Sequence, residues 1–247
     1  MKSTVLITTY KRAHLLKWGL TSLANKPVPP QTEFVVLNDG VEDDTEKVCH
    51  KFKNKLDIKY IFTGKNRKVP WRIPGYAINH GVKQTDSDLI FLSCAEIYHM
   101  DNSLIQMVDV LSQNPKLLTI PSQGKDDVGP FLKKLPNVTE DDYNALGLLH
   151  NIHLPFFMGM NRKDFIDIGG YDEDFVGCGW DDNDIVERMR AVGNLYHAVP
   201  CRIVHLWHQR LNFGIKKVMD DYKYNQRLYI SRRSHPRRNI DKNWGQI

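Results

Sequence analysis

The run Thr4-Val5-Leu6-Ile7-Thr8-Thr9 decides how the first half of this chain folds. It is apolar and β-branched without alternation, which is typical of a parallel strand buried on both faces. Residues 13–25 then have the composition of a helix, and prolines interrupt the chain after them. A second apolar run, Glu33-Phe34-Val35-Val36-Leu37, ends at Asn38-Asp39-Gly40. This strand–helix–strand order predicts two parallel strands joined by a crossover helix.

The same alternation continues to residue 92. The pattern predicts further helices at 43–54 and 74–83, and further strands at 58–62 and 88–92. This order indicates an α/β fold of Rossmann-like type, with a mostly parallel, doubly wound central sheet flanked by helices. Ligands of such sheets bind at the carboxyl ends of the strands. Polar, motif-like residues stand at those ends, at positions 8–10, 38–40 and 93–96.

The second half is less regular, but no linker or repeat separates it from the first. We predict helices at 102–113, 162–168 and 213–232, and strands at 119–122, 156–160 and 195–204. Residues 123–150 are expected to form an irregular insertion that carries several acids. We therefore predict a single domain over residues 1–247, in which 1–100 and 101–247 are two functional halves.

Composition excludes several classes of protein. The chain is 41% hydrophobic and 26% charged, which argues against global disorder. The formal net charge is +5, and nothing resembles a nucleic-acid-binding motif, so nucleic acid is not an expected partner. Much of the excess charge lies in a basic tail, which could attract phosphates or a membrane surface, although a solvated tail is the favoured interpretation. Its cations are Arg227, Arg232, Arg233, Arg237, Arg238 and Lys242.

The cysteines and the chain start indicate a cytoplasmic protein. The four cysteines are widely spaced and form neither a CxxC pair nor a zinc pattern, so reduced thiols are expected. Met1 leads directly into the first predicted strand, without a signal peptide. No apolar run approaches the ~20 residues that cross a bilayer.

The segment Gly169-Gly170-Tyr171-Asp172-Glu173-Asp174-Phe175 begins an unusual concentration of acids, glycines and aromatics. It is followed by Gly179-Trp180-Asp181-Asp182-Asn183-Asp184, and a helix is predicted from Asp184 to Met189. Glycines permit backbone conformations that other residues avoid, so we expect a shaped loop that carries carboxylates into a site. An EF-hand is not supported, because no Asp-x-Asp-x-Asp-Gly loop with a Glu at its twelfth position is present.

The first half resembles the nucleotide-binding half of family 2 glycosyltransferases, which have the GT-A fold. Two motifs carry most of this resemblance, Thr8-Thr9-Tyr10-Lys11-Arg12 and Val36-Leu37-Asn38-Asp39-Gly40. In the family the opening loop contacts the nucleoside, which implies this role for Thr8, Tyr10 and Arg12. The later acid hydrogen-bonds the base, which implies that role for Asp39. A turn residue before Gly40 is the structural alternative for Asp39.

A third segment, Arg72 to Gly81, matches the family only in part. Ile78 replaces the arginine that the family has before Asn79. The resemblance implies that Asn79 helps to bind the nucleotide-sugar. Arg72 could neutralise the diphosphate, since guanidinium groups bind phosphate well.

The family's metal motif, Asp-x-Asp, is altered in this chain. Cys94-Ala95-Glu96 stands at its place, so Glu96 is the implied metal ligand, while Cys94 and Ala95 are implied to line the donor site. The family also has a metal-binding histidine in His-x-x-His motifs, to which His205-Leu206-Trp207-His208 corresponds. Both His205 and His208 are candidates, with His208 preferred. The expected cofactor is Mn²⁺ or Mg²⁺, and imidazole ligands suit Mn²⁺ better.

The acidic segment resembles the GGYDE…GWDDND element of galactosyltransferase-type enzymes, which lines the acceptor site and supplies the base. The resemblance implies that Asp182 is the catalytic base and that Asp181 binds acceptor hydroxyls. Trp180 could stack on a sugar face, and Asp184 is expected to serve the helix start.

We therefore predict an inverting, metal-dependent glycosyltransferase. The resemblance implies a nucleotide-sugar donor, a UDP-sugar by preference, that carries a hexose or N-acetylhexosamine. The acceptor would be a glycan or glycoconjugate hydroxyl. Two alternatives stay open: a catalytically inactive nucleotide- or glycan-binding module, which the altered metal motif favours, and a nucleotidyltransferase. The latter would carry a Gly-rich loop after the first strand, whereas residues 8–12 contain no glycine.

Overall fold

Four parallel strands form one half of the central sheet, as expected from the sequence. The computed structural model describes residues 1–64 and 73–246. The strand order begins β3-β2-β1-β4, and these strands pair in parallel. Thr9 lies opposite Asn38, and Thr8 lies opposite Cys94, so the motif-bearing strand ends are level with one another. The strands are β1 (Ser3–Thr9), β2 (Thr32–Asn38), β3 (Asp57–Phe62) and β4 (Leu89–Cys94).

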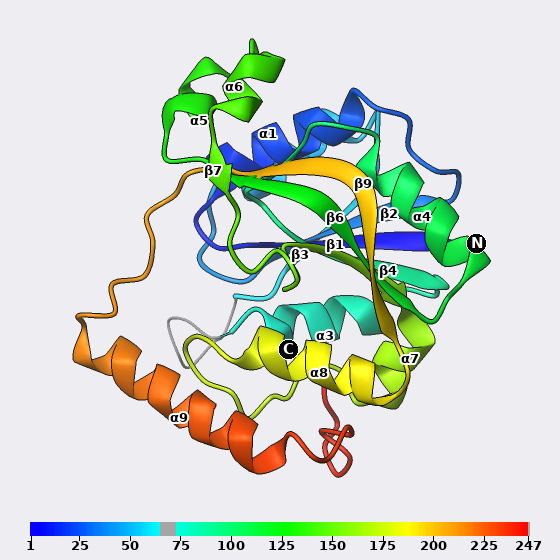
Figure 1. Cartoon of the computed structure of the whole chain (residues 1–247), viewed down its shortest axis with the longest axis vertical. Helices are drawn as coiled ribbons and strands as arrows, with labels where there is room; N and C mark the ends of the chain where they lie inside the picture. Colours follow the sequence, from blue (N-terminus) through cyan, green and yellow to red (C-terminus); the bar gives the residue numbers. More distant parts are fainter. Residues whose placement is uncertain (65–72, 247) are drawn as a thin grey trace.

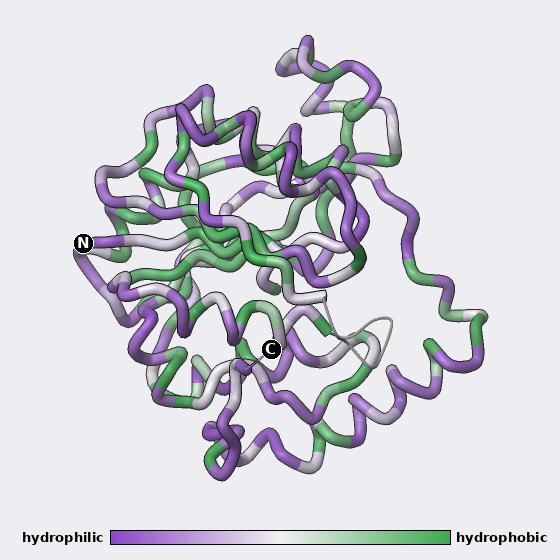
Figure 2. Tube along the Cα trace, turned by 180° about the vertical axis from the view of Figure 1, so that it is seen from behind, coloured by the Kyte–Doolittle hydropathy of each residue, from purple (hydrophilic) through white to green (hydrophobic). Residues whose placement is uncertain are grey.

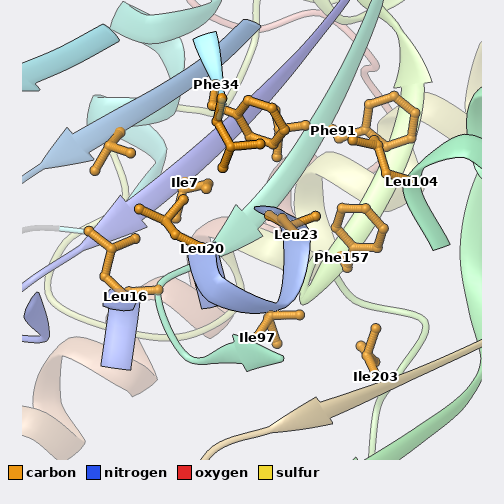
Figure 3. Close-up of a cluster of buried hydrophobic side chains, with 14 of the residues drawn as sticks. Ile7, Leu16, Leu20, Leu23, Phe34, Phe91, Ile97, Leu104, Phe157 and Ile203 are labelled. Carbon is orange, nitrogen blue, oxygen red and sulfur yellow. The ribbon is translucent and has the colours of Figure 1, made fainter. Parts of the chain in front are cut away.

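Helices cover both faces of this sheet and bury two separate apolar layers (Figure 1). One face packs against α1 (Ala13–Ala24), α2 (Thr45–Phe52) and α4 (Ser103–Gln113). Figure 3 shows Leu16, Leu20 and Leu23 of α1 in the same buried cluster as Phe34, Phe91 and Phe157 of the strands. The other face packs against α3 (Gly75–Lys83), α7 (Arg162–Asp167) and α8 (Asp181–Ala191). The predicted α/β layering is therefore confirmed.

The second half of the sheet is mixed rather than parallel. β8 (Phe157–Asn161) joins β4 in antiparallel pairing, and β6 (Leu117–Asp126), β9 (Leu195–His205) and β5 (Ile97–His99) follow in that order. β7 (Gly147–Leu148) pairs with β6 at the edge. The apolar run of β8 predicts a buried strand but carries no information about its direction. The strand β5 was not expected.

β6 is longer than the four residues predicted from its apolarity. Its last four residues, Gln123 to Asp126, pair with Arg202 to His205 of β9 after a bulge near Pro121. The partner strand, not an apolar pattern, holds this polar extension in the sheet. The expected irregular insertion consequently begins later and contains α5 (Pro130–Lys134) and α6 (Glu140–Asn144).

The C-terminal region packs back on the body of the protein. α9 (Lys216–Arg232) runs along the outside near α8, and it is mainly hydrophilic (Figures 1 and 2). Beyond it, Arg238, Asn239 and Trp244 are all buried. The favoured interpretation of a solvated basic tail is therefore wrong for this part of the tail. Within the described residues, no helix combines the length and the apolarity needed to cross a membrane.

Candidate active site

Glu96, His205 and His208 form a cluster at the carboxyl ends of the parallel strands. Glu96 lies in the turn between β4 and β5, and His205 ends β9. Pairing of β5 with β9 sets Ile97 opposite His205, and the Leu206 N–H donates to the Glu96 carbonyl oxygen at 2.8 Å. One ligand atom from each of the three side chains lies within 4.8 Å of the others. The structure thus brings together the three residues predicted as metal ligands.

The chemistry of this cluster fits a divalent cation. The Nε2 atoms of His205 and His208 lie 3.8 and 3.5 Å from Glu96 Oε1. Glu96 Oε2 is buried and has no hydrogen-bond partner in the described residues. Burial alone would raise the pKa of Glu96, but the nearby His205 ring and the positive charge of Arg12 hold that pKa at about 2. An ionised, partly unpartnered carboxylate beside two imidazoles is a donor set that Mn²⁺ accepts.

Cys94 does not add a thiolate to this set. Its side chain is half-buried, and burial raises the pKa of the thiol well above its usual value, with the negative charge of Glu96 as a further cause. Its Sγ faces the Phe156 carbonyl oxygen at 3.9 Å. A neutral thiol is a poor ligand for a hard cation, which argues against a cysteine–zinc site.

Asp126 at the end of β6 and Asp127 directly after it hold the segment that carries the two histidines. The sequence did not identify these acids as site residues. Asp126 Oδ1 lies 2.9 Å from His205 Nδ1 and accepts from Arg210 Nη2 at 2.6 Å. The Asp127 carboxylate accepts from the Trp207 N–H at 3.3 Å. A hydrogen bond at Nδ1 fixes the ring and leaves Nε2 directed at Glu96. These acids were missed because the strand was expected to end at Ser122.

Arg12 contacts the cluster directly. Its Nη1 forms an ion pair with Glu96 Oε1, and its Nη2 lies 3.1 Å from His208 Nδ1. The resemblance had implied a contact with the nucleoside, so the structure gives this side chain a position that the sequence did not predict.

The other donor-site candidates lie at the predicted strand ends. The Asp39 N–H donates to the Thr9 carbonyl oxygen, and the buried Asp39 carboxylate accepts from the Thr63 hydroxyl. The ring of Tyr10 covers Gly40 so closely that a Cβ there would lie 2.5 Å from it. The Ala95 N–H donates to the Thr8 carbonyl oxygen at 3.0 Å, which joins the ends of β1 and β4.

Among the other predicted donor residues, Arg72 lies outside the described residues, and Asn79 does not enter this arrangement. Asn79 is fully buried, and its amide donates to the Tyr171 carbonyl oxygen and to Glu173 while accepting from the Tyr171 N–H. The amide is therefore used to hold the acidic loop against α3, and we do not carry Asn79 into the proposed donor site.

The acidic loop delivers two adjacent carboxylates at the start of α8. The helix begins at Asp181, three residues earlier than expected, and Gly179 and Trp180 precede it with φ of 85° and 72°. Burial raises the pKa of Asp182, although a hydrogen bond from the Tyr171 hydroxyl at 2.9 Å acts to lower it. Burial and the neighbouring Asp182 charge raise the pKa of Asp181 well above its usual value. The negative charge of Asp182 also contributes to the raised pKa of Cys94, which stands two residues before Glu96 in the chain.

Trp180 packs against α9. Its ring centroid lies 5.1 Å from that of Tyr229 and 5.7 Å from that of Tyr222. Phe213 continues this row, with its ring 5.6 Å from Tyr222. Any sugar stacking by Trp180 would therefore use the part of the ring that these tyrosines leave open.

Asp184 lies in the first turn of α8, at the helix start as expected, and its carboxylate also pairs with two arginines. Asp184 accepts from Arg188 Nε at 2.7 Å and from Arg238 Nη2 at 2.9 Å, and all three side chains are buried. Arg238 also pairs with Asp172 through Nε at 3.0 Å. We call Asp172, Asp184, Arg188 and Arg238 the framework cluster. It ties the acidic loop, α8 and the tail to one another.

Two family comparisons agree with this geometry. The model of the family described as "Glycosyl transferase family 2" matches residues 4–169. The model described as "N-terminal domain of galactosyltransferase" matches residues 157–210, a range that includes the acidic loop and both candidate histidines.

The chain spans about half the length of the curated relatives it matches. It is 26% identical over 225 residues to validoxylamine A glucosyltransferase of Streptomyces hygroscopicus subsp. limoneus, covering 77% of this chain and 48% of the relative. It is 22% identical over 226 residues to the poly-beta-1,6-N-acetyl-D-glucosamine synthase of Staphylococcus epidermidis, covering 85% of this chain and 53% of the relative.

Solved structures show the same fold at low identity. S. aureus TarS matches with a TM-score of 0.67 and 17% identity, over 94% of this chain and 39% of TarS. The mannosyltransferase PcManGT of Pyrobaculum calidifontis, solved with GDP-Man and Mn²⁺, matches with a TM-score of 0.64 and 15% identity, over 94% of this chain and 64% of that protein. A fragment of TarS has been solved with UDP-GlcNAc. These neighbours identify the fold as GT-A.

Proposed function

This chain belongs to glycosyl transferase family 2, and from that premise we propose that it transfers a sugar from a nucleotide-sugar to a hydroxyl group of a glycan or glycoconjugate. The observation that carries the proposal is the convergence of Glu96, His205 and His208 at the carboxyl ends of the parallel strands. In open α/β sheets this edge is where ligands bind. The cluster therefore lies where a donor's diphosphate would need a cation.

The donor is proposed to lie across the ends of β1, β2 and β4. Thr8, Tyr10 and Asp39 are the residues that would contact its nucleoside. A carboxylate such as Asp39 can accept hydrogen bonds from a base N–H or from ribose hydroxyls. Nucleotide-sugars bound to TarS and to PcManGT support this class of donor. We prefer a UDP-sugar that carries a hexose or N-acetylhexosamine.

Glu96, His205 and His208 would hold a divalent cation, Mn²⁺ by preference and Mg²⁺ as the alternative. The ion would neutralise the charge that develops on the departing diphosphate. Asp126 positions His205 for this task through the hydrogen bond at Nδ1. The remaining chemistry belongs to side chains of the acidic loop and α8.

We assign Asp182 as the base of a single displacement. The acceptor hydroxyl gives its proton to the Asp182 carboxylate while an oxygen lone pair forms the new bond to the anomeric carbon. The bond from that carbon to the diphosphate oxygen breaks, and its electron pair leaves with the nucleoside diphosphate. One base on the side opposite the leaving group inverts the anomeric configuration. Asp181 and the open part of the Trp180 ring would position the acceptor.

A non-catalytic binding module is the rival function that one observation favours. Cys94 replaces the first acid of the family's metal motif, and burial keeps its thiol neutral. A protein with this defect could bind a nucleotide without turning it over. Nucleotidyl transfer has no comparable support, since the family match lies with glycosyltransferases.

The decisive experiment measures nucleotide binding and turnover in the same samples. Thermal unfolding midpoints are recorded with UDP, GDP, CDP and dTDP, each with Mn²⁺, Mg²⁺ or EDTA, because ligand binding to the folded state raises stability. We expect one nucleotide, UDP by preference, to raise the midpoint in a Mn²⁺-dependent way. A screen of the matching nucleotide-sugars for release of the free nucleotide follows.

The variant Glu96→Ala sharpens that experiment. We expect it to raise the Mn²⁺ concentration needed for the shift, whereas Asp109→Ala, which removes an exposed carboxylate from α4, leaves the response unchanged. Binding without turnover of any donor would favour the binding module. No shift with any nucleotide would contradict the donor site itself.

A further inference from the structure

The guanidinium of Arg12 lies between two of the three candidate metal ligands. Arg12 precedes α1, directly after Lys11, whose φ of 55° turns the chain at the end of β1. The side chain is 30% exposed, whereas Glu96 is buried. One guanidinium nitrogen pairs with Glu96 Oε1 and the other lies 3.1 Å from His208 Nδ1. A positive charge is therefore already present among the atoms that would hold a metal ion.

One ring nitrogen of His208 has two competing partners. Its Nδ1 lies 3.1 Å from Arg12 Nη2 and 2.9 Å from the Gln209 carbonyl oxygen. A ring nitrogen that accepts from a guanidinium cannot at the same time donate to a carbonyl. When Nδ1 accepts from Arg12, the neutral ring carries its proton on Nε2, the atom that faces Glu96 at 3.5 Å. That tautomer has no lone pair to offer a metal there.

The Gln209 carbonyl oxygen, which is the second partner of His208 Nδ1, allows the other tautomer of the ring. If Arg12 leaves, Nδ1–H can donate to the Gln209 carbonyl oxygen, and Nε2 then presents its lone pair toward Glu96. Hydrogen bonding of one ring nitrogen to a backbone carbonyl is how metal-binding histidines are commonly oriented. The residues for both states of the ring are thus already in place.

We propose that Arg12 is an internal cation that occupies the metal site when no metal is bound, and that it must leave Glu96 and His208 before a divalent cation can bind. The contact with Glu96 supplies a permanent positive charge to a buried carboxylate whose other neighbours are two imidazoles. Its cost is a weaker affinity of the free protein for metal, because the ion must displace a competing positive charge. This inference rests on the metal site of the proposed function, and it assigns Arg12 a role in controlling that site.

Direct titration of Mn²⁺ by electron paramagnetic resonance tests this inference without an activity assay. Free Mn²⁺ is measured as nucleotide-free protein is added, for the wild type, Arg12→Ala and Lys11→Ala. We expect Arg12→Ala to lower the Mn²⁺ dissociation constant about tenfold, which is about 1.4 kcal/mol. Lys11→Ala is the matched control, because it removes the same charge from the adjacent exposed residue. We expect it to change the constant less than twofold.

Arg12→Gln keeps the proposal testable if the alanine variant fails to fold. Its side chain is shorter than that of arginine and carries no charge, so Mn²⁺ should again bind more tightly than to the wild type. Equal or weaker Mn²⁺ binding by the folded Arg12 variants, relative to Lys11→Ala, would overturn the proposal.

UDP binding at saturating Mn²⁺, measured on the same samples, separates this failure from that of the donor site. If the wild type and the variants all bind UDP but the Arg12 variants do not bind Mn²⁺ more tightly, the role of Arg12 is overturned and the donor proposal stands.

Discussion

Asp182 and Asp184 lie two residues apart in the first turn of α8, and their surroundings differ sharply. Asp184 accepts from two arginines and is 1% exposed. Asp182 accepts from the Tyr171 hydroxyl and has no ion-pair partner in residues 1–64 and 73–246. A carboxylate with two cations is committed to the fold, whereas a partly buried carboxylate without one binds a proton more readily. The difference teaches that the presence of cationic partners, and not the position along the helix, separates an acid of the framework cluster from a candidate catalytic base.

The same contrast extends to the whole acidic loop. Asp172 is paired with Arg238 and Arg232, and Asp174 is paired with Arg232 and Lys242. These cations come from the end of α9 and from the tail. The loop can therefore carry many acids because the tail neutralises those that do not face the site. Asp181 and Asp182 form no ion pair with these cations or with any other within the described residues.

The largest expected effect comes from Asp182→Asn, which removes the proposed base without changing its shape. We expect the transfer rate to fall about 10²- to 10⁴-fold, the range that general base catalysis contributes. The affinity for nucleotide and the unfolding midpoint should be retained. Rates are measured with the donor found in the nucleotide screen, with Asp109→Asn as a control for the chemical change. A parallel loss of nucleotide binding would remove Asp182 from the base role.

The framework side of the comparison is tested by Arg238→Ala. This change leaves Asp172 and Asp184 each with one cation fewer in a buried setting, so we expect the free energy of unfolding to fall by about 3 kcal/mol. Arg237→Ala removes the exposed neighbouring charge and should change it by no more than about 0.5 kcal/mol. Urea denaturation of both variants measures the difference. Equal stability of the two would contradict the framework role.

A third prediction concerns the acid that holds the metal site. Asp126→Ala removes the hydrogen-bond partner of His205 Nδ1, so we expect Mn²⁺ to bind about 10- to 100-fold more weakly. Asp141→Ala, which removes an exposed acid from α6, should leave the affinity unchanged. The paramagnetic titration described for Arg12 measures both. Unaltered affinity in Asp126→Ala would show that His205 needs no such support.

The smallest expected effect is a gain in stability from Asp181→Asn. Burial and the charge of Asp182 raise the pKa of Asp181 in the folded protein above its value in the unfolded chain. The contribution of Asp181 to the free energy of unfolding is therefore fully favourable only below the pKa of the unfolded chain, and it is lost as pH rises through the pKa of the folded protein. An amide does not titrate, so the variant should be more stable than the wild type at pH 7, by about 0.5–2 kcal/mol. The gain should shrink as pH falls. Urea denaturation at several pH values measures it, and a pH-independent difference would contradict the assignment.

Much of the fold followed from local patterns. The alternation of apolar strands and helices predicted β1 to β4 with their crossover helices, and the strand ends predicted where site residues gather. The metal candidates were found because Glu96 and His205 each follow an apolar run. The prediction of a mostly parallel sheet did not include the antiparallel pairing of β8, and the predicted end of β6 and the solvated tail were wrong. Each of these depends on a partner elsewhere in the chain: β9 for β6, and the acidic loop for the tail.

The sequence by itself determined the order of elements, the residues at the strand ends and the concentration of acids before α8. These are local properties, since hydrophobic period and residue type can be read within a few positions. Only the tertiary structure decided which charges meet: Arg12 with Glu96, Asp126 with His205, and Arg238 with Asp184. The partners in these pairs are 84, 79 and 54 residues apart. Whether a carboxylate is neutralised depends on such long-range contacts, and that is why packing, not sequence pattern, separates the framework acids from the candidate base.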